Sequence, residues 1–147
     1  MKPESAVVQE LKRLAEEGDG VLTPESVVEA ARVKSCPLHK CFEWDDSEAA
    51  AAWRLHQARN LLRVCVQILP NEKAGKECKV FVSLTPDREE TGGGYRLLTR
   101  VLSQADQRAQ LLADALAEMR VFEAKYEALT ELADVFAAIR RVRVKRS

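Results

Sequence analysis

The residue types with the most obvious chemical potential lie close together in one segment. Cys36-Pro37-Leu38-His39-Lys40-Cys41 places two thiols and an imidazole within six residues, and Cys65 and Cys78 follow. Thiolate and imidazole groups are the ligands of structural zinc, but such sites usually draw on closely spaced cysteine pairs. Cys65 and Cys78 each stand alone in an expected strand. We therefore expect reduced cysteines that pack in the core, and no metal or other cofactor.

The acidic cluster that follows Trp44 is a second candidate site. Asp45, Asp46 and Glu48 could together hold a divalent cation. Carboxylates at a helix start also stabilise the positive end of its dipole, and the spacing of Asp45 and Glu48 fits a capping box. The sequence therefore predicts a helix start here, without a metal.

Enzyme motifs are missing from the sequence. It contains no P-loop, dinucleotide fingerprint, H-E-x-x-H or G-x-S-x-G motif, and the glycines at 92–94 lack the lysine and hydroxyl that cradle a phosphate. We expect a binding protein and not an enzyme.

Polar and cationic side chains on the helix expected over residues 46–62 are better suited to binding. Arginine matches guanine, and glutamine or asparagine matches adenine, in the major groove of duplex DNA. Lysines on a following hairpin and cations in the C-terminal tail would contact phosphates. The candidates are Arg54, Gln57, Arg59, Asn60 and Arg63 on the helix, Lys73, Lys76 and Lys79 on the hairpin, and Arg140, Arg141, Arg143 and Lys145 in the tail. A solvated helix face explains the helix residues equally well, and the acids at its start oppose a DNA backbone.

Three helices and a hairpin are expected to position these groups. Ser5 caps a first helix to about Glu17, and Thr23 with Pro24 starts a second that runs to about Val33. In the second helix we expect Val27, Val28 and Ala31 to be buried. A connector with Leu38, Phe42 and Trp44 in the core leads to the third helix, whose Ala49, Ala52, Trp53, Leu55 and Leu62 are expected to face inward. Residues 64–69 and 79–84 form the hairpin. This order is that of a winged-helix module.

The C-terminal third is expected to be one long helix. Residues 85–94 form a glycine-rich hinge, residues 95–102 a short helix, and a long helix then runs from about 103 to 140. Apolar residues alternate in steps of four and three, as in a coiled coil, and this predicts a homo-oligomer. The oligomerisation residues are Leu112, Met119, Phe122, Tyr126, Leu129 and Phe136. The alternative is that this stripe packs on the protein's own N-terminal part.

The composition is that of a folded globular protein. The 147 residues are 46% hydrophobic and 31% charged, and no apolar run is long enough to span a membrane, so we expect a cytoplasmic protein. The net charge is zero, but the last eight residues hold five cations and no acid. We predict a mainly α fold with a small β-hairpin (α+β): a winged-helix-like head at 1–84, a hinge at 85–94 and a helical oligomerisation arm at 95–147.

Several segments resemble a group of short uncharacterised proteins encoded by phages and prophages. They are the sequences at 22–32, 37–39, 42–46 and 57–59, continuing through 81–84 and 93–96. The resemblance implies a viral setting, with the host cytoplasm as location, and brings no catalytic residue. The layout is similar to phage small terminase subunits and phage regulators.

Together these patterns favour an oligomeric, phage-type DNA-binding protein with a role in packaging or regulation. The alternative is a protein-interaction adaptor or host-modulating protein that binds no nucleic acid.

Overall fold

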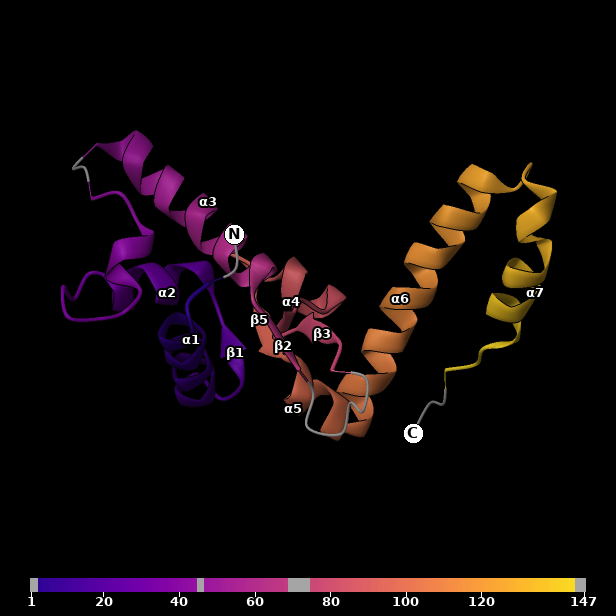
Figure 1. Ribbon diagram of the computed structural model, residues 1–147, viewed down its shortest axis with the longest axis horizontal. Coiled ribbons are helices and arrows are strands. Elements are labelled where there is room, and N and C mark those ends of the chain that lie inside the picture. Colours follow the sequence, from indigo (N-terminus) through magenta and orange to yellow (C-terminus); the bar gives the residue numbers. More distant parts are fainter. Residues whose placement is uncertain (1–2, 45–46, 69–74, 145–147) are drawn as a thin grey trace. The chain divides into compact units, whose positions relative to one another are not determined.

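A computed structural model describes residues 3–44, 47–68 and 75–144. The chain is mainly helical with small antiparallel sheets, as predicted, and it divides into an N-terminal unit, Met1–Arg100, and a C-terminal unit, Val101–Ser147 (Figure 1). The hinge predicted at residues 85–94 is not the division between the units, because residues 95–97 form a strand of the N-terminal unit.

The first two helices follow from their apolar spacing and their caps. Helix α1, Ser5–Glu17, buries Val7, Leu11 and Ala15, which lie four residues apart on one face. Its N-cap is Glu4, so the predicted cap at Ser5 is wrong by one residue. After strand β1, Val21–Leu22, helix α2, Pro24–Ala31, begins with the predicted cap.

The cap of α2 is a reciprocal pair of hydrogen bonds. The Ser26 backbone N–H donates to Thr23 Oγ1 at 3.1 Å, and the Thr23 N–H donates to Ser26 Oγ at 3.2 Å. Pro24 occupies the first helical position, where no hydrogen-bond donor is needed. The predicted buried residues Val27, Val28 and Ala31 are confirmed, although the helix ends two residues earlier than Val33.

A compact connector with the 3-10 helix η1, His39–Cys41, links α2 to α3. Leu38 and Phe42 are buried, and the Trp44 indole N–H donates to the His39 carbonyl at 2.9 Å, as its ring stacks on the His39 ring. Helix α3, Glu48–Val64, is capped by the Ser47 side chain. The predicted capping box at Asp45 lies outside the described residues.

The strands form two separate antiparallel sheets. Strands β2, Val66–Ile68, and β3, Glu77–Lys79, make a hairpin, with Gln67 opposite Cys78. A hairpin was predicted here, but its second strand was expected at 79–84 and overlaps β3 only at Lys79. Strand β4, Phe81–Val82, was expected to continue this hairpin but belongs to the second sheet, of order β1-β5-β4.

Strand β5, Tyr95–Leu97, is the centre of the three-stranded sheet. Leu22 pairs with Tyr95 on one edge of β5, and Phe81 pairs with Leu97 on the other. The helix predicted over 95–102 is therefore wrong in its first half, and α5, Leu98–Ser103, forms only the second. The predicted hinge is also ordered: it contains α4, Thr85–Glu89, and a turn in which Gly92 and Gly93 have positive φ.

An ion pair joins α4 to the sheet. The Arg96 guanidinium on β5 makes two hydrogen bonds of 2.7 Å to the buried Asp87 carboxylate on α4. A bidentate pair of this kind adds geometric specificity. The core lies between the helices and this sheet, and includes Leu11, Leu22, Val27, Leu38, Ala58, Leu62, Val80 and Leu97.

The C-terminal unit is a helical hairpin and not one long helix. Helix α6, Ala105–Tyr126, ends 14 residues before the predicted Arg140, and the 3-10 helix η2, Thr130–Leu132, leads into α7, Ala133–Arg141. The Phe122 and Phe136 rings meet edge to face, with centroids 6.3 Å apart, and Arg140 pairs with Glu123. The turn allows Phe136 to be buried by the protein's own α6, which a straight helix could not do. Among the described residues, no helix is both long and apolar enough to cross a membrane.

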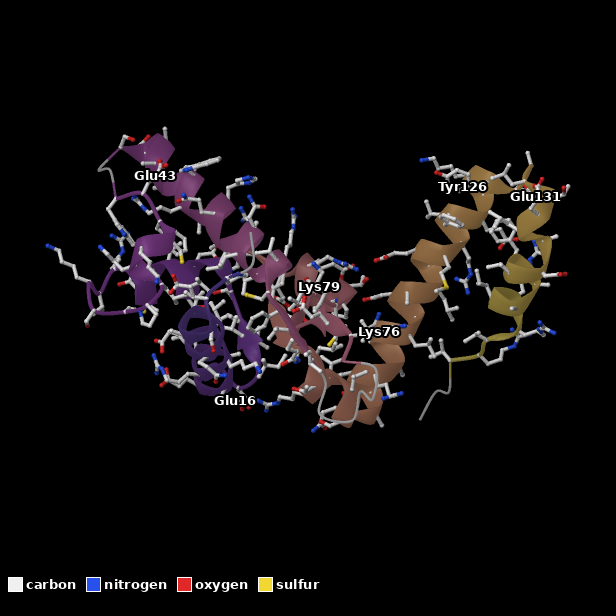
Figure 2. All side chains as sticks on the ribbon, in the orientation of Figure 1. Glu16, Glu43, Lys76, Lys79, Tyr126 and Glu131 are labelled. Carbon is white, nitrogen blue, oxygen red and sulfur yellow. The ribbon has the colours of Figure 1, made fainter. Side chains whose placement is uncertain are left out.

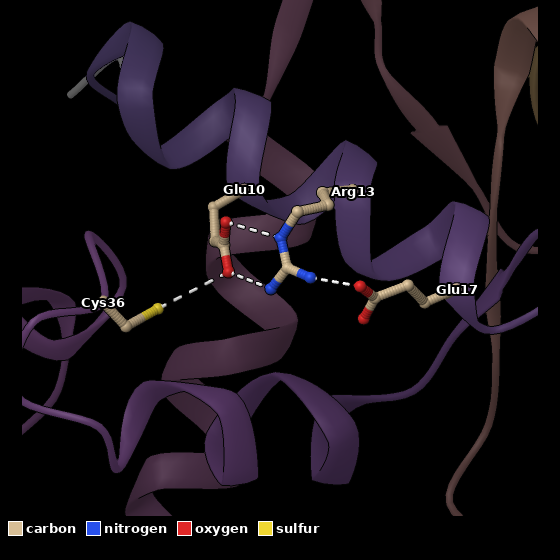
Figure 3. A network of polar contacts seen from close by, with 4 residues as sticks. All are labelled: Glu10, Arg13, Glu17 and Cys36. Atoms are coloured by element: carbon tan, nitrogen blue, oxygen red, sulfur yellow. Dashed lines mark hydrogen bonds and ion pairs between the residues drawn. The ribbon is translucent and has the colours of Figure 1, made fainter.

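A polar network ties α1 to the connector (Figure 3). The Arg13 guanidinium bridges Glu10 and Glu17, and the Cys36 thiol donates to Glu10 Oε1 at 3.8 Å. The hydrogen bond from Arg13 is the main reason that the pKa of Glu10 lies below its ordinary value.

We predict a pH-dependent effect of Glu10→Gln. Because the folded-state pKa of Glu10 is lowered, the ionised carboxylate contributes stability above its unfolded pKa, and this is lost as the pH falls through the folded value. Arg13 is exposed and Glu10 is half-buried, so solvent screens the pair and the variant should lose less than about 1 kcal/mol of unfolding free energy near neutral pH. The two proteins should converge in acid. Urea titrations at both pH values measure this, and a difference that persists in acid would contradict it.

Candidate nucleic-acid interface

One side of α3 is exposed along most of the helix. We call it the α3 outer face. Its members lie three or four residues apart, as neighbours on a helix surface do. They are Trp53, His56, Asn60, Arg63 and Val64, all exposed. The opposite side contains the buried Arg54, Ala58 and Leu62, which turn toward the core.

Arg54, predicted to contact DNA, is instead a core residue. It is only 6% exposed, its Nη1 donates to the Glu43 carbonyl at 3.1 Å, and its guanidinium lies 5.3 Å from the centroid of the Trp44 ring. Gln57 is half-buried, and its Oε1 accepts the Glu43 N–H at 3.4 Å. Both side chains therefore hold the connector against α3 and are not free to read a partner.

Trp53, predicted to face inward, is 47% exposed. Ala49 and Ala52, also expected inside, are exposed as well. The Trp53 ring stacks on His56 with a centroid distance of 5.1 Å, and the His56 Nε2 and Asn60 Nδ2 atoms are 3.0 Å apart. An aromatic ring and two hydrogen-bonding groups thus form a continuous strip on the outer face. The sequence signal that could have placed Trp53 on this face is its helical spacing, three residues before His56 and seven before Asn60.

Cations gather at the C-terminal end of the outer face. Arg59 is half-buried and Arg63 is exposed one turn later. The Lys79 ammonium donates to the Arg63 carbonyl, and the Val80 N–H donates to the Cys65 carbonyl at 3.1 Å. These two contacts hold β3 beside the end of α3.

The β2–β3 hairpin adds exposed lysines to this end. Lys79 is the last residue of β3, and Lys76 directly precedes this strand (Figure 2). Both side chains are exposed. The predicted Lys73 lies outside the described residues. From residue 49 to residue 71 the sequence contains no Asp or Glu, although the whole chain has 23. The arginines of α3 therefore lie in an acid-free segment, whereas Lys76 and Lys79 of the hairpin lie on either side of Glu77.

The cysteine-rich connector has ordinary structural roles. His39 Nδ1 is 2.8 Å from the Ala31 carbonyl, and burial raises the pKa of the Cys41 thiol, and that of Cys65 to about 11. Within residues 3–44, 47–68 and 75–144, no three ligand-type side chains gather into a group that could hold a metal ion.

The predicted tail and oligomerisation residues belong to the C-terminal unit. Arg140 pairs with Glu123, Arg141 and Arg143 are exposed, and Lys145 lies outside the described residues. Phe136 is buried and Leu112 and Tyr126 are half-buried, whereas Met119, Phe122 and Leu129 are exposed.

No protein-family model matches the chain, and comparisons with curated proteins and with solved structures return no match either. Function has to be inferred from the chain's own residues.

We predict opposite outcomes for two arginines of α3. Arg54→Ala should lower the unfolding free energy by about 2 kcal/mol, because it removes a buried, charge-assisted hydrogen bond to Glu43. Arg63→Ala, the matched control, should change it by less than about 0.5 kcal/mol, since its side chain is exposed. Urea unfolding of both variants measures the difference, and equal losses would mean that Arg54 is not a core residue.

Proposed function

We propose that the N-terminal unit binds duplex DNA through the α3 outer face. The observation that carries this proposal is the exposed strip of His56, Asn60 and Arg63 within an acid-free segment, beside the lysines of β3. Duplex binding is driven by cations that neutralise phosphates, and base edges are read by hydrogen-bonding side chains.

The order of elements supports the proposal. The N-terminal unit contains α1, β1, α2, α3, β4 and β5 in this order, with the β2–β3 hairpin between α3 and β4 and with α4 between β4 and β5. Without these two insertions the order and the sheet β1-β5-β4 are similar to those of a winged-helix module. In helix-turn-helix proteins the second helix of the pair enters the major groove, and α3, which packs on α2, has that place in the chain. Such an analogy of fold does not by itself fix function.

In this arrangement each side chain has a distinct role. Asn60 and Arg63 can donate to base edges, whereas Lys76, Lys79 and Arg59 lie at the margin of the outer face, where the phosphate backbone would run. Trp53 would make apolar contact with a thymine methyl group or a sugar. Arg141 and Arg143 would add sequence-independent phosphate contacts from the C-terminal unit. In a viral setting, such binding would serve genome packaging or regulation.

We predict that Arg59→Ala with Arg63→Ala weakens DNA binding. Each substitution removes a cation from the outer face, so affinity should fall about tenfold or more and the salt slope should become shallower by roughly 1 to 2. Fluorescence anisotropy on a labelled duplex at several salt concentrations measures both quantities.

The matched control is Lys12→Ala with Lys34→Ala, which removes two cations of the same unit outside α3. It should leave affinity within about twofold, since these cations lie outside the proposed contact. If the wild-type protein binds no duplex at tens of micromolar and low salt, the proposal is wrong. If both double variants lose affinity equally, binding exists but is not centred on α3.

A protein partner is the second candidate function, and it is favoured by exposed apolar residues near the same face. Trp53, Val64 and Ile68 are all exposed on α3 and β2. Apolar groups gathered on a surface are typical of protein interfaces. A partner retained by the wild-type protein after nuclease treatment, and lost with Trp53→Ala, would support this function over DNA binding.

A further inference from the structure

The exposed large apolar residues are concentrated in the C-terminal unit. Six of the ten that occur among the described residues belong to it, although it has less than a third of the chain. They are Met119, Val121, Phe122, Leu129, Val135 and Val142. Single exposed apolar residues need no explanation, but a concentration of this kind marks an interaction surface.

Two helices alone cannot cover the apolar residues between them. Phe122 contacts both Tyr126 and Phe136 and is still 47% exposed. Val135 and half-buried Ile139 lie one turn apart on one face of α7, and the exposed Val142, the C-cap residue, follows Ile139 by three residues. Stable helical folds bury such a face under a further layer. We call the exposed apolar face of α7, formed by these three residues, the α7 stripe.

The charges around α7 are separated along its length. Glu127, Glu131 and Asp134 lie at the turn and the start of α7, and no cation occurs from residue 126 to residue 139. Arg140, Arg141 and Arg143 lie at the opposite end. One end of the α7 stripe is therefore acidic and the other is basic, with apolar residues between them.

We propose that a second copy of the chain covers the α7 stripe, with its own α7 antiparallel. Two-fold symmetry brings the same surface of both copies together, so each residue faces its counterpart across the axis. With the axis near Ala137, Glu131 of one copy lies at the level of Arg143 of the other, whereas Arg140 keeps its partner Glu123 in its own chain. Acids then meet cations at both ends, and Val135 faces Ile139. A parallel pair would place like charges together, which costs several kcal/mol.

This charge order also complements the dipole of α7 itself, because acids favour a helix start and cations its end. That explanation concerns one chain only. It accounts for the charges but not for the exposed Val135, which is 50% accessible. The dimer accounts for both, and the proposal does not depend on DNA binding.

The first experiment is the mass of the full chain in solution without DNA. Sedimentation equilibrium should give a dimer, twice the chain mass of 16.5 kDa, whose dissociation constant rises with salt. A monomer at about 100 micromolar in low salt overturns the proposal, and would mean that the protein's own N-terminal unit or another partner covers the stripe. Since DNA is absent, this failure is separate from a failure of DNA binding.

Charge reversal then tests the antiparallel arrangement. Glu131→Lys replaces the acid of the Glu131–Arg143 pair by a cation, and Arg143→Glu replaces its cation by an acid. Each variant alone should dimerise at least about tenfold more weakly, because like charges meet. Mixed in equal amounts, the two should form a heterodimer with an affinity within about threefold of wild type, measured by energy transfer between labelled chains. If the charges serve only the helix dipole, mixing restores nothing, and the arrangement is wrong.

An apolar substitution tests the stripe without changing charge. Val135→Ser should raise the dissociation constant about tenfold, whereas Ala137→Ser, exposed on the opposite side of α7, should change it by less than about twofold. Circular dichroism confirms that both variants keep their helices. Equal effects of the two substitutions would contradict the placement of the interface.

Discussion

The N-terminal unit depends on the pairing of β5 with two strands that come from opposite ends of it. Residues 21–22 and 95–97 are more than 70 positions apart, yet they form one ladder, and β4 completes the sheet on the other edge. This pairing closes the chain around the core. The ion pair of Arg96 with Asp87, and that of Arg100 with Asp19 at 3.2 Å, fasten the same segment to α4 and to the turn after α1. Loop-closure entropy is the main cost of such a contact, and burial of Leu22 and Leu97 offsets it.

The closed sheet also determines which side chains of α3 are exposed. Its C-terminal half is fixed by Ala58 and Leu62 in the core and by the Val80 and Lys79 contacts with its last turn. Its outer face is left exposed as a consequence of this packing. A surface built on a rigid helix presents side chains more accurately than a loop would, which suits a recognition role. The C-terminal unit differs, because Phe122 stays 47% exposed although its ring contacts those of Tyr126 and Phe136.

Local signals were sufficient for some elements and not for others. The cap at Thr23 was predicted correctly because cap chemistry depends on adjacent residues. A hairpin after α3 was also predicted, but its second strand is β3, Glu77–Lys79, and not residues 79–84. Strand β5 was not predicted correctly, because a strand of three residues is determined by the strands it pairs with, which are distant in the sequence. For α3 the inward prediction is right at Leu62 and wrong at Trp53. Alanines at 49–52 fit any face, so the contact of Arg54 with Glu43 and Trp44 decides which side of the first half faces inward. The turn after Tyr126 contains no glycine or proline, so nothing local predicted it.

That turn has a consequence for how the chain assembles. From residue 127 to residue 132 every side chain is compatible with a helix, and none of the positive-φ residues among those described lies there. Opening the turn therefore meets no fixed backbone obstacle, and what is lost is the packing of Phe136 on Phe122 and the ion pair of Arg140 with Glu123. The same packing is recovered if α7 of one molecule folds onto α6 of another. Domain exchange of this kind is a low-cost route between monomers and dimers, and short connections between packed elements favour it.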